Sequence, residues 1–319
     1  MVVRDEVAAV INIHNGDVMA VTAKRAGLPG EHLSFRESLI TGPVTTTLEW
    51  LGTRARFLSS AYGEELLRTS NSLFEQEQAL NAAAESDEEI VLWFEHDLFC
   101  LVHFVYLLQR FRQRNVSFVW CSDVLAGREP DDLLRLFNSR ASATPAIFDI
   151  AARAWGAYTS PDPRMLNDMF TIGNELPFLR DGMRLHGSRF PSIGNGLGAV
   201  ENQLLKIIAS GAADFAMLFG QFDEQPPRFG FGDAAVLYIL RAMAGRAVPL
   251  ITMVQTEDTP PKATFAITPA GENVMNGAVD DISVNDPDLW LGGAHVTKET
   301  VWRWDDSRGE IILSRPAGS

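Results

Sequence analysis

"VLWFEHDLFC" (residues 91–100) joins an apolar run directly to three ionisable side chains. Every residue from 90 to 94 is apolar, which is typical of a strand covered on both faces of a parallel sheet. Glu95, His96 and Asp97 follow at the position where that strand should end. The stretch therefore predicts an inner strand with a polar group of residues at its carboxyl end.

Strand and helix signals alternate over the first 125 residues. The expected strands cover residues 8–13, 32–36, 90–94 and 116–121. The expected helical segments cover residues 18–26, 45–84 and 98–112, the second with breaks near Gly63 and Ser70. Strand–helix–strand repeats predict parallel strands joined by right-handed crossovers. We therefore expect an α/β fold with a small, open, Rossmann-like parallel sheet. Neither the G-x-G-x-x-G nor the G-x-x-x-x-G-K-[ST] pattern follows a strand, so a common dinucleotide or P-loop site is not expected.

The remainder of the chain divides at a glycine-rich stretch. Residues 191–198, "PSIGNGLG", hold three glycines and one proline, which favours a boundary. Helices at 199–210 and 233–244 and a terminal hairpin turning at 305–309 resemble a winged-helix arrangement. The predicted organisation is an α/β domain at 1–125, a helical region at 126–195 and a winged-helix-like α+β domain at 196–319.

Composition narrows the function classes. The formal net charge of −14 gives a long-range field that disfavours nucleic acid and anionic membranes as partners. A DNA-reading helix should be rich in basic residues, yet the segment 233–244 holds only Arg241. No segment has the roughly 20 apolar residues of a membrane span. Two cysteines in apolar surroundings fit a reducing cytoplasm better than a disulfide scaffold.

Polar residues follow each of the four expected strands. They are His14, Asn15 and Asp17 around Gly16, then Arg36 and Glu37, then Glu95, His96 and Asp97, and finally Ser122 and Asp123. Open parallel sheets bind ligands beyond the carboxyl ends of their strands. The sequence therefore predicts a site for a small polar or anionic ligand at this edge.

The residue types at these ends indicate several roles. The candidates for catalysis are His14, Asp17, Glu37, His96 and Asp97. The candidates for substrate contact are Asn15, Gly16, Arg36, Glu95 and Asp123. Histidine and carboxylate together suit general acid–base chemistry, and Arg36 suits an anionic group. The same types suit a divalent metal, for which the candidate ligands are His14, Asp17, His96 and Asp97.

Each of these residues also has a structural interpretation. Asp17 and Asp97 stand where helices begin and could serve as N-caps. Arg36 and Glu37 could pair with each other at the sheet edge, and both histidines could be buried at the edge of the core. His103, between Val102 and Phe104, is expected to be a buried structural histidine.

Several motifs together resemble a known family. "HNGDVMAVTAKRAGLPGEHLSFRESLITGPV" (residues 14–44) and "VLWFEHDLFC" resemble the bacterial domain-of-unknown-function 1835 family, whose members carry H-x-G-D, R-E with G-P, and W-x-E-H-D motifs. "FPSIGNGLGAVENQLL" (190–205), "TPAGENVMNG" (268–277) and "WLGGAHVTKETVWRWD" (290–305) resemble the 3658 domain that accompanies it. The resemblance implies that the motif positions are His14, Gly16, Asp17, Arg36, Glu37, Gly42, Pro43, Glu95, His96 and Asp97. It implies no activity. The family often has a polar residue soon after E-H-D, where this chain has Cys100 and Leu101.

Three functional hypotheses follow. The first is a cytoplasmic enzyme, or an enzyme-like binding protein, that acts on a small polar or anionic substrate by acid–base or metal-assisted chemistry. The second is a ligand-sensing regulator whose winged-helix-like unit binds DNA or a protein partner. The third is a pure interaction protein, which requires the polar residues at the strand ends to serve only as helix caps and ion pairs.

Overall fold

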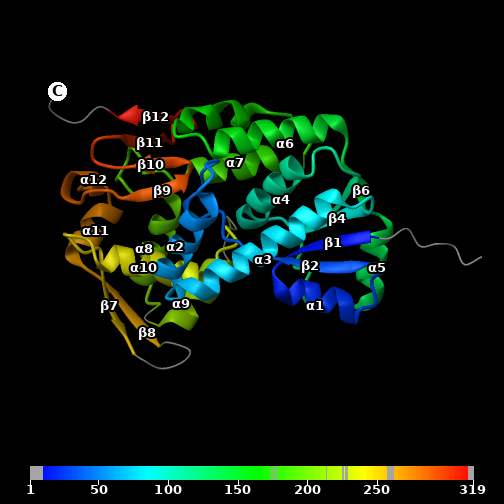
Figure 1. Cartoon of the computed structure of the whole chain (residues 1–319). Coiled ribbons are helices and arrows are strands. Elements are labelled where there is room, and N and C mark those ends of the chain that lie inside the picture. The colour runs from blue at the N-terminus through cyan, green and yellow to red at the C-terminus, as the bar shows by residue number, and fades with distance from the viewer. Residues whose placement is uncertain are drawn as a thin grey trace, which may run out of the picture.

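A five-stranded sheet forms one side of the molecule (Figure 1). Its order is β2-β1-β4-β5-β6, in which the first four strands are parallel and β6 is antiparallel. The strands are β1 (Val10–Asn15), β2 (Glu31–Phe35), β4 (Glu89–Glu95), β5 (Val116–Cys121) and β6 (Ala141–Ser142). The structure, a computed structural model, describes residues 10–314 except 174, 177, 213, 225, 227, 228 and 257–261. Residues 8 and 9 of the first expected strand lie outside this part.

The predicted α/β fold is confirmed, and the strand order identifies a switch point. The chain passes from β1 to β2 on one side, and β4 then pairs with the other side of β1. The connections therefore leave β1 and β4 in opposite directions. This arrangement opens a crevice between adjacent carboxyl ends. The residues after β1 and β4 stand at that crevice.

Side chains alternate between the two faces of this sheet. In β4, Val91 and Trp93 pack with α1 (Asp17–Arg25) and α5 (Pro130–Asn138), whereas Leu92 and Phe94 pack on the other face. That other face meets α3 (Leu66–Glu85), α4 (Leu98–Arg110) and α6 (Pro145–Tyr158). Both faces are covered, which explains why β4 is apolar throughout.

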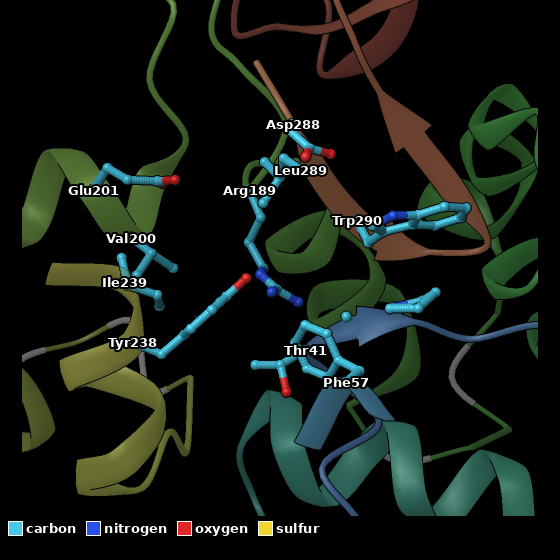
Figure 2. Close-up of a pocket in the computed structure, with 12 residues that line it drawn as sticks. Thr41, Phe57, Arg189, Val200, Glu201, Tyr238, Ile239, Asp288, Leu289 and Trp290 are labelled. Carbon is cyan, nitrogen blue, oxygen red and sulfur yellow. The ribbon is translucent and has the colours of Figure 1, made fainter. Parts of the chain in front are cut away.

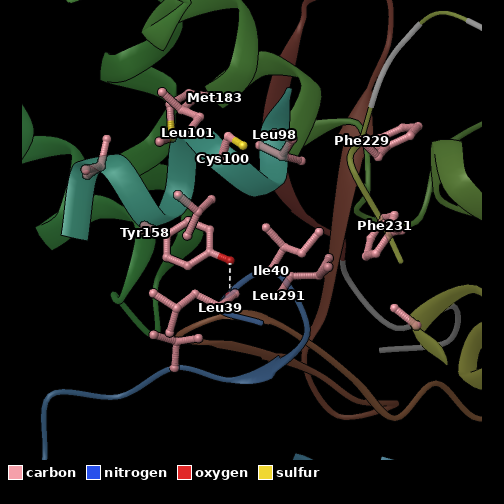
Figure 3. Close-up of a cluster of buried hydrophobic side chains, with 14 of the residues drawn as sticks. Leu39, Ile40, Leu98, Cys100, Leu101, Tyr158, Met183, Phe229, Phe231 and Leu291 are labelled. Carbon is pink, nitrogen blue, oxygen red and sulfur yellow. Dashed lines mark hydrogen bonds between the residues drawn. The ribbon is translucent and has the colours of Figure 1, made fainter. Parts of the chain in front are cut away.

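Helix α4 lies at the centre of the main core. Ten of its 13 residues are buried, so it is hydrophobic on nearly all sides. Figure 3 shows its Leu98 and Leu101 beside side chains from all three predicted segments of the chain. Across this cluster the Tyr158 hydroxyl donates a hydrogen bond of 2.7 Å to the Leu39 carbonyl.

One of the other helices precedes α3 and the rest follow the sheet in the chain, and the C-terminal part also holds small antiparallel strand pairs. The helices are α2 (Trp50–Tyr62, before α3), η1 (Pro163–Thr171), α7 (Leu179–Gly187), α8 (Ala199–Ala209), α9 (Phe215–Glu224), α10 (Asp233–Ala244), α11 (Pro269–Met275) and α12 (Asp281–Val284). The strands are β7 (Ile251–Gln255) with β8 (Ala263–Ile267), β9 (Leu289–Gly292) with β10 (Ala294–Val296), and β11 (Val301–Asp305) with β12 (Glu310–Ser314). The hairpin expected around residues 305–309 is confirmed by the pairing of β11 with β12.

The N-terminal and C-terminal parts are joined by a strand pairing. The short strand β3 (Gly42–Pro43) runs parallel to β9, so a loop of the α/β part completes a C-terminal sheet. The expected boundaries near residues 125 and 195 fall between elements, but a single hydrophobic cluster extends from Ile11 to Ile311 across both. Among the described residues, no helix is both long enough and apolar enough to cross a membrane.

Candidate functional site

A cleft of about 610 Å³ opens beyond the carboxyl ends of β1, β2 and β4. We call it the strand-end cleft. It is lined by Asn15, Gly16, Asp17, Phe35, Arg36, Glu37, Glu95, Asp97, Phe99, Val124, Asp223, Gly230, Phe231 and Gly232. Seven of the ten residues predicted from the sequence are in this group. His14, His96 and Asp123 are the three that are not.

The turn after β1 places Gly16 at the wall of the cleft. Gly16 has a φ of 84°, which glycine adopts without strain, and its N–H donates to the Phe35 carbonyl at 3.1 Å. Gly16 is the N-cap residue of α1, and Asp17 is the first residue of that helix. Because Gly16 and not Asp17 occupies the N-cap position, the interpretation of Asp17 as an N-cap is wrong.

Asp17 instead pairs with Arg36. The Arg36 Nε donates to both carboxylate oxygens of Asp17 at 2.8 and 3.0 Å, and Nη2 lies 2.8 Å from Oδ1. This contact lowers the pKa of Asp17 and raises the pKa of Arg36. Both side chains are about half exposed, so the pair contributes little to stability. Arg36 therefore does not pair with Glu37, which corrects that expectation.

Glu37 belongs to a buried ion pair with Arg54. Arg54 Nη2 lies 2.8 Å from Glu37 Oε1, and both side chains are almost wholly inaccessible. Arg54 also donates to the carbonyls of Ser38, Thr41 and Pro43. The Glu37 carboxylate thus stabilises the loop 36–43 through Arg54. Because it is buried and already paired, it is a poor candidate for catalysis. Arg54 was not predicted from the sequence. Its position four residues before Leu58, on the same face of the helix, is a signal that could have identified it.

Two carboxylates at the end of β4 and just after it are held by hydrogen bonds from backbone N–H groups. Glu95 Oε1 accepts the Leu125 N–H at 2.7 Å, which ties the end of β4 to the loop after β5. Asp97 Oδ1 accepts the Cys100 N–H at 2.7 Å, so the expected N-cap of α4 is confirmed. Capping leaves Asp97 at the cleft, so one side chain both caps the helix and lines the cavity.

A loop from the C-terminal part forms one wall of the cleft. The Phe229 carbonyl accepts the Phe99 N–H at 3.0 Å. A Cβ on Gly230 would lie 2.6 Å from Asp97 Oδ1, so only glycine permits this approach. With Asp223 from α9, this loop brings residues far along the chain onto the carboxyl ends of the strands. No local pattern in the sequence predicts Asp223 or Phe231 as cleft residues.

His14 lies on the α1 face of the sheet, away from the cleft. His32 Nε2 donates to the Leu28 carbonyl, so its Nδ1 is the acceptor for His14 Nε2 at 2.9 Å. The His14 ring packs between His32 and Trp93. Burial, followed by the nearby His32, lowers the pKa of His14 to about 3, so the imidazole is neutral.

His96 points to the opposite side of the strand end from Glu95. Its ring centroid lies 4.0 Å from that of Phe178, and its Nδ1 accepts the Trp120 Nε1–H at 3.2 Å. Partial burial lowers the pKa of His96. Asp123 is also outside the cleft, where it pairs with Arg128 at 3.0 Å. The expectation that a histidine shares the site with the carboxylates is therefore corrected.

The four candidate metal ligands do not meet. His14 lies on the α1 face and His96 lies beside Phe178, whereas Asp17 and Asp97 line the cleft. Across residues 10–314, leaving out the gaps named above, no group of three or more His, Cys, Asp and Glu side chains is arranged to hold a metal ion.

A buried polar network supports the cleft from beneath. The Leu39 N–H donates to His103 Nε2 at 3.2 Å, which places the ring proton on Nδ1. That proton is donated to Asn15 Oδ1 at 3.2 Å, and Asn15 Nδ2 donates to Cys100 Sγ at 3.0 Å. Burial lowers the pKa of His103 to about 3. The expectation of a buried structural histidine at position 103 is confirmed.

Comparison of the sequence with known protein families gives no match, and comparison with curated proteins gives none. The resemblance to the domain-of-unknown-function 1835 family and its 3658 partner domain therefore stays a prediction. A function for this chain has to be inferred from the cleft and from the residues around it.

Proposed function

We propose that the protein binds a small polar molecule in the strand-end cleft and acts on it as an enzyme or enzyme-like protein. One observation carries this proposal: seven residues singled out by their position after expected strands line a single cleft. That cleft stands where open parallel sheets place their ligands. Six of its lining residues are also motif positions of the resembled family, which adds support for the site.

The charges of the cleft indicate the chemistry of the ligand. Five lining residues are acids and only Arg36 is basic. Arg36 neutralises Asp17, and Arg54 neutralises Glu37. Within the described part of the chain, Glu95 and Asp223 form no ion pair. Carboxylates accept hydrogen bonds, so the ligand that fits is an amine or a polyhydroxylated molecule. Arg36 is a weak anchor for an anion because Asp17 occupies its guanidinium.

Glu95 is the residue that we propose as the general base. It is half-buried, and the Leu125 N–H orients one of its oxygens. A positioned carboxylate at the wall of a cleft can take a proton from a bound amine or hydroxyl group. This role replaces the one that the sequence assigned to His14 or His96, neither of which lines the cleft.

The test uses Glu95→Gln with Asp123→Asn as its matched control. The glutamine amide oxygen can still accept the Leu125 N–H, so the fold is preserved while the charge is removed. Thermal unfolding is measured with panels of small amines, sugars, carboxylates and phosphates. We expect an amine or a sugar to raise the melting temperature of the natural protein and of Asp123→Asn, but not of Glu95→Gln. Stabilisation by carboxylates or phosphates alone would contradict the proposal.

The alternative regulator function has less support. In α10, the only basic residue is Arg241, and its guanidinium donates to Gln255 at 3.0 and 3.2 Å. A DNA-reading surface would need several free basic side chains. Cys100 and Cys121 are both buried and unbridged, which supports a reducing compartment, and we propose the cytoplasm.

A further inference from the structure

A second pocket lies where the N-terminal and C-terminal parts meet. Residues of β3, α2, α8, α10 and β9 line it, and its volume is about 290 Å³ (Figure 2). We call it the junction pocket. This volume is close to the lower end of small-molecule sites, about 300 Å³. An adjacent cavity of about 510 Å³ shares Glu201, Tyr238 and Leu289 with it, so a larger ligand has room to extend.

A buried cation faces this pocket without a carboxylate partner. Arg189 is only 6% exposed, and no acid in the described part of the chain lies close enough to form an ion pair with it. Its Nη2 donates to the Ile40 carbonyl at 2.6 Å, and its Nη1 donates to His186 Nδ1 at 3.3 Å. Burial lowers the pKa of Arg189. The Tyr158 side chain also interacts with this guanidinium, and the Arg189 Cζ lies 5.2 Å from the centroid of the Phe231 ring. None of these partners is a carboxylate, and a buried charge is costly unless it is paired.

An anion stands across the same pocket. Glu201, on α8, makes no hydrogen bond and no ion pair within the described residues, although its negative charge favours the protonated form of Arg189. Figure 2 shows the Glu201 carboxylate directed toward the space beside Arg189. The other acid at the pocket, Asp288, is mostly exposed and bonds to His295 at 2.7 Å. Glu201 and Arg189 therefore present opposite charges that do not neutralise each other directly.

The remaining walls of the pocket are largely apolar. Phe57 and Tyr238 meet edge to face with ring centroids 5.7 Å apart, and Leu289 and Trp290 also line the pocket. In Figure 2 the Tyr238 hydroxyl is directed toward the Arg189 guanidinium. Such walls favour an apolar side chain on the ligand, and aromatic rings pack well in these positions.

We propose that the junction pocket binds a small zwitterion with an apolar side chain, such as a free aromatic or branched aliphatic amino acid. The ligand carboxylate docks on Arg189, its ammonium group docks on Glu201, and its side chain packs against Phe57 and Tyr238. A zwitterion supplies both missing partners at once, whereas a simple anion would leave Glu201 beside it as a like charge. This site is separate from the strand-end cleft and does not depend on the function proposed there.

Calorimetric titration with three related molecules tests the charge pattern. L-phenylalanine carries both charges, 3-phenylpropanoate lacks the ammonium group, and 2-phenylethylamine lacks the carboxylate. We expect phenylalanine, or L-leucine as the aliphatic alternative, to bind about ten-fold or more tightly than either singly charged analogue. Equal binding by the analogues, or no binding of either amino acid, would overturn the proposal.

Glu201→Gln tests the position of the site without disturbing buried Arg189. We expect it to weaken amino-acid binding about ten-fold. Binding of 3-phenylpropanoate should instead become tighter, because its carboxylate docks on Arg189 and no longer meets the like charge of Glu201. Glu272→Gln, an exposed substitution on α11 of the same part of the chain, is the matched control and should change neither affinity. An unchanged affinity of Glu201→Gln for phenylalanine would place the amino acid elsewhere and refute the assignment.

Discussion

A single arginine holds the loop that the two sites share. Arg54 is fully buried and donates to the Glu37 carboxylate and to three carbonyls of residues 38–43. Arg36 and Glu37 at one end of this loop line the strand-end cleft, whereas Gly42 and Pro43 at the other end line the junction pocket. A guanidinium with several fixed donors suits this task, because it satisfies backbone groups that a loop would otherwise leave unpaired.

Buried neutral histidines make the stability of the protein depend on pH. The folded-state pKa of His103 is about 3, below the ordinary value of 6.5. As the pH falls, His103 is therefore protonated in the unfolded protein before it is protonated in the folded protein. The stability contributed by the neutral ring is complete above pH 6.5 and is lost progressively toward pH 3. His14 behaves in the same way, with a pKa of about 3.

We expect His103→Gln to flatten this pH dependence. Glutamine can accept the Leu39 N–H and donate to Asn15, but it does not titrate. The fall in unfolding free energy between about pH 6 and pH 5 should become smaller by about 1 kcal/mol. Urea unfolding at both pH values measures the difference. The same fall in the variant and in the natural protein would show that His103 takes up a proton without unfolding.

At the scale of elements, the sequence located the strand ends more reliably than it identified which side chains of each end enter the cleft. Asn15 faces α4 and bonds to Cys100, whereas the preceding residue, His14, faces α1. Glu95 and His96 diverge in the same way after β4. A strand reverses the direction of its side chains at each residue, so an error of one position moves a residue from the cleft to the opposite face.

Helix boundaries were predictable where the chemistry is local. The expected break near Gly63 is present, because Gly63 has a φ of 73° and ends α2. The expected break near Ser70 is absent, because α3 continues from Leu66 to Glu85 through that residue. The wall formed by Phe229–Gly232 was not predictable, since it depends on packing between segments more than about 100 residues apart.

We expect Gly230→Ala to be more damaging than Gly63→Ala. Both glycines have a φ of 73°, so alanine at either position carries the backbone strain of the left-handed region, about 1–2 kcal/mol. A Cβ at Gly63 would meet nothing within 4 Å, whereas a Cβ at Gly230 would lie 2.6 Å from the Asp97 carboxylate. Urea unfolding of both variants measures the additional loss. Hydrogen exchange at the Phe99 amide should also increase only in Gly230→Ala. Equal losses in the two variants would mean that the loop moves away from Asp97 without cost.

At the scale of the whole molecule, the core is continuous across the predicted domain boundaries. The central cluster includes Leu101 of α4, Tyr158 of α6 and Leu291 of β9, one from each predicted segment. The pairing of β3 with β9 and the contact of Phe229 with Phe99 add backbone hydrogen bonds between distant parts. Both cavities are also lined by residues from the N-terminal and the C-terminal parts of the chain. Local sequence patterns locate boundaries between elements, but they do not reveal how much apolar surface is later buried across them.

A continuous core predicts that the protein unfolds as one cooperative unit. Leu101→Ala and Leu291→Ala each remove a fully buried side chain, from α4 and from β9 respectively, at a cost of about 2–5 kcal/mol. Because both belong to one cluster, each should lower the melting temperature of a single calorimetric transition, with van't Hoff and calorimetric enthalpies in agreement. If residues 196–319 formed an independent domain, two transitions would be seen and Leu291→Ala would shift only one of them. Scanning calorimetry of the natural protein and the two variants decides between these outcomes.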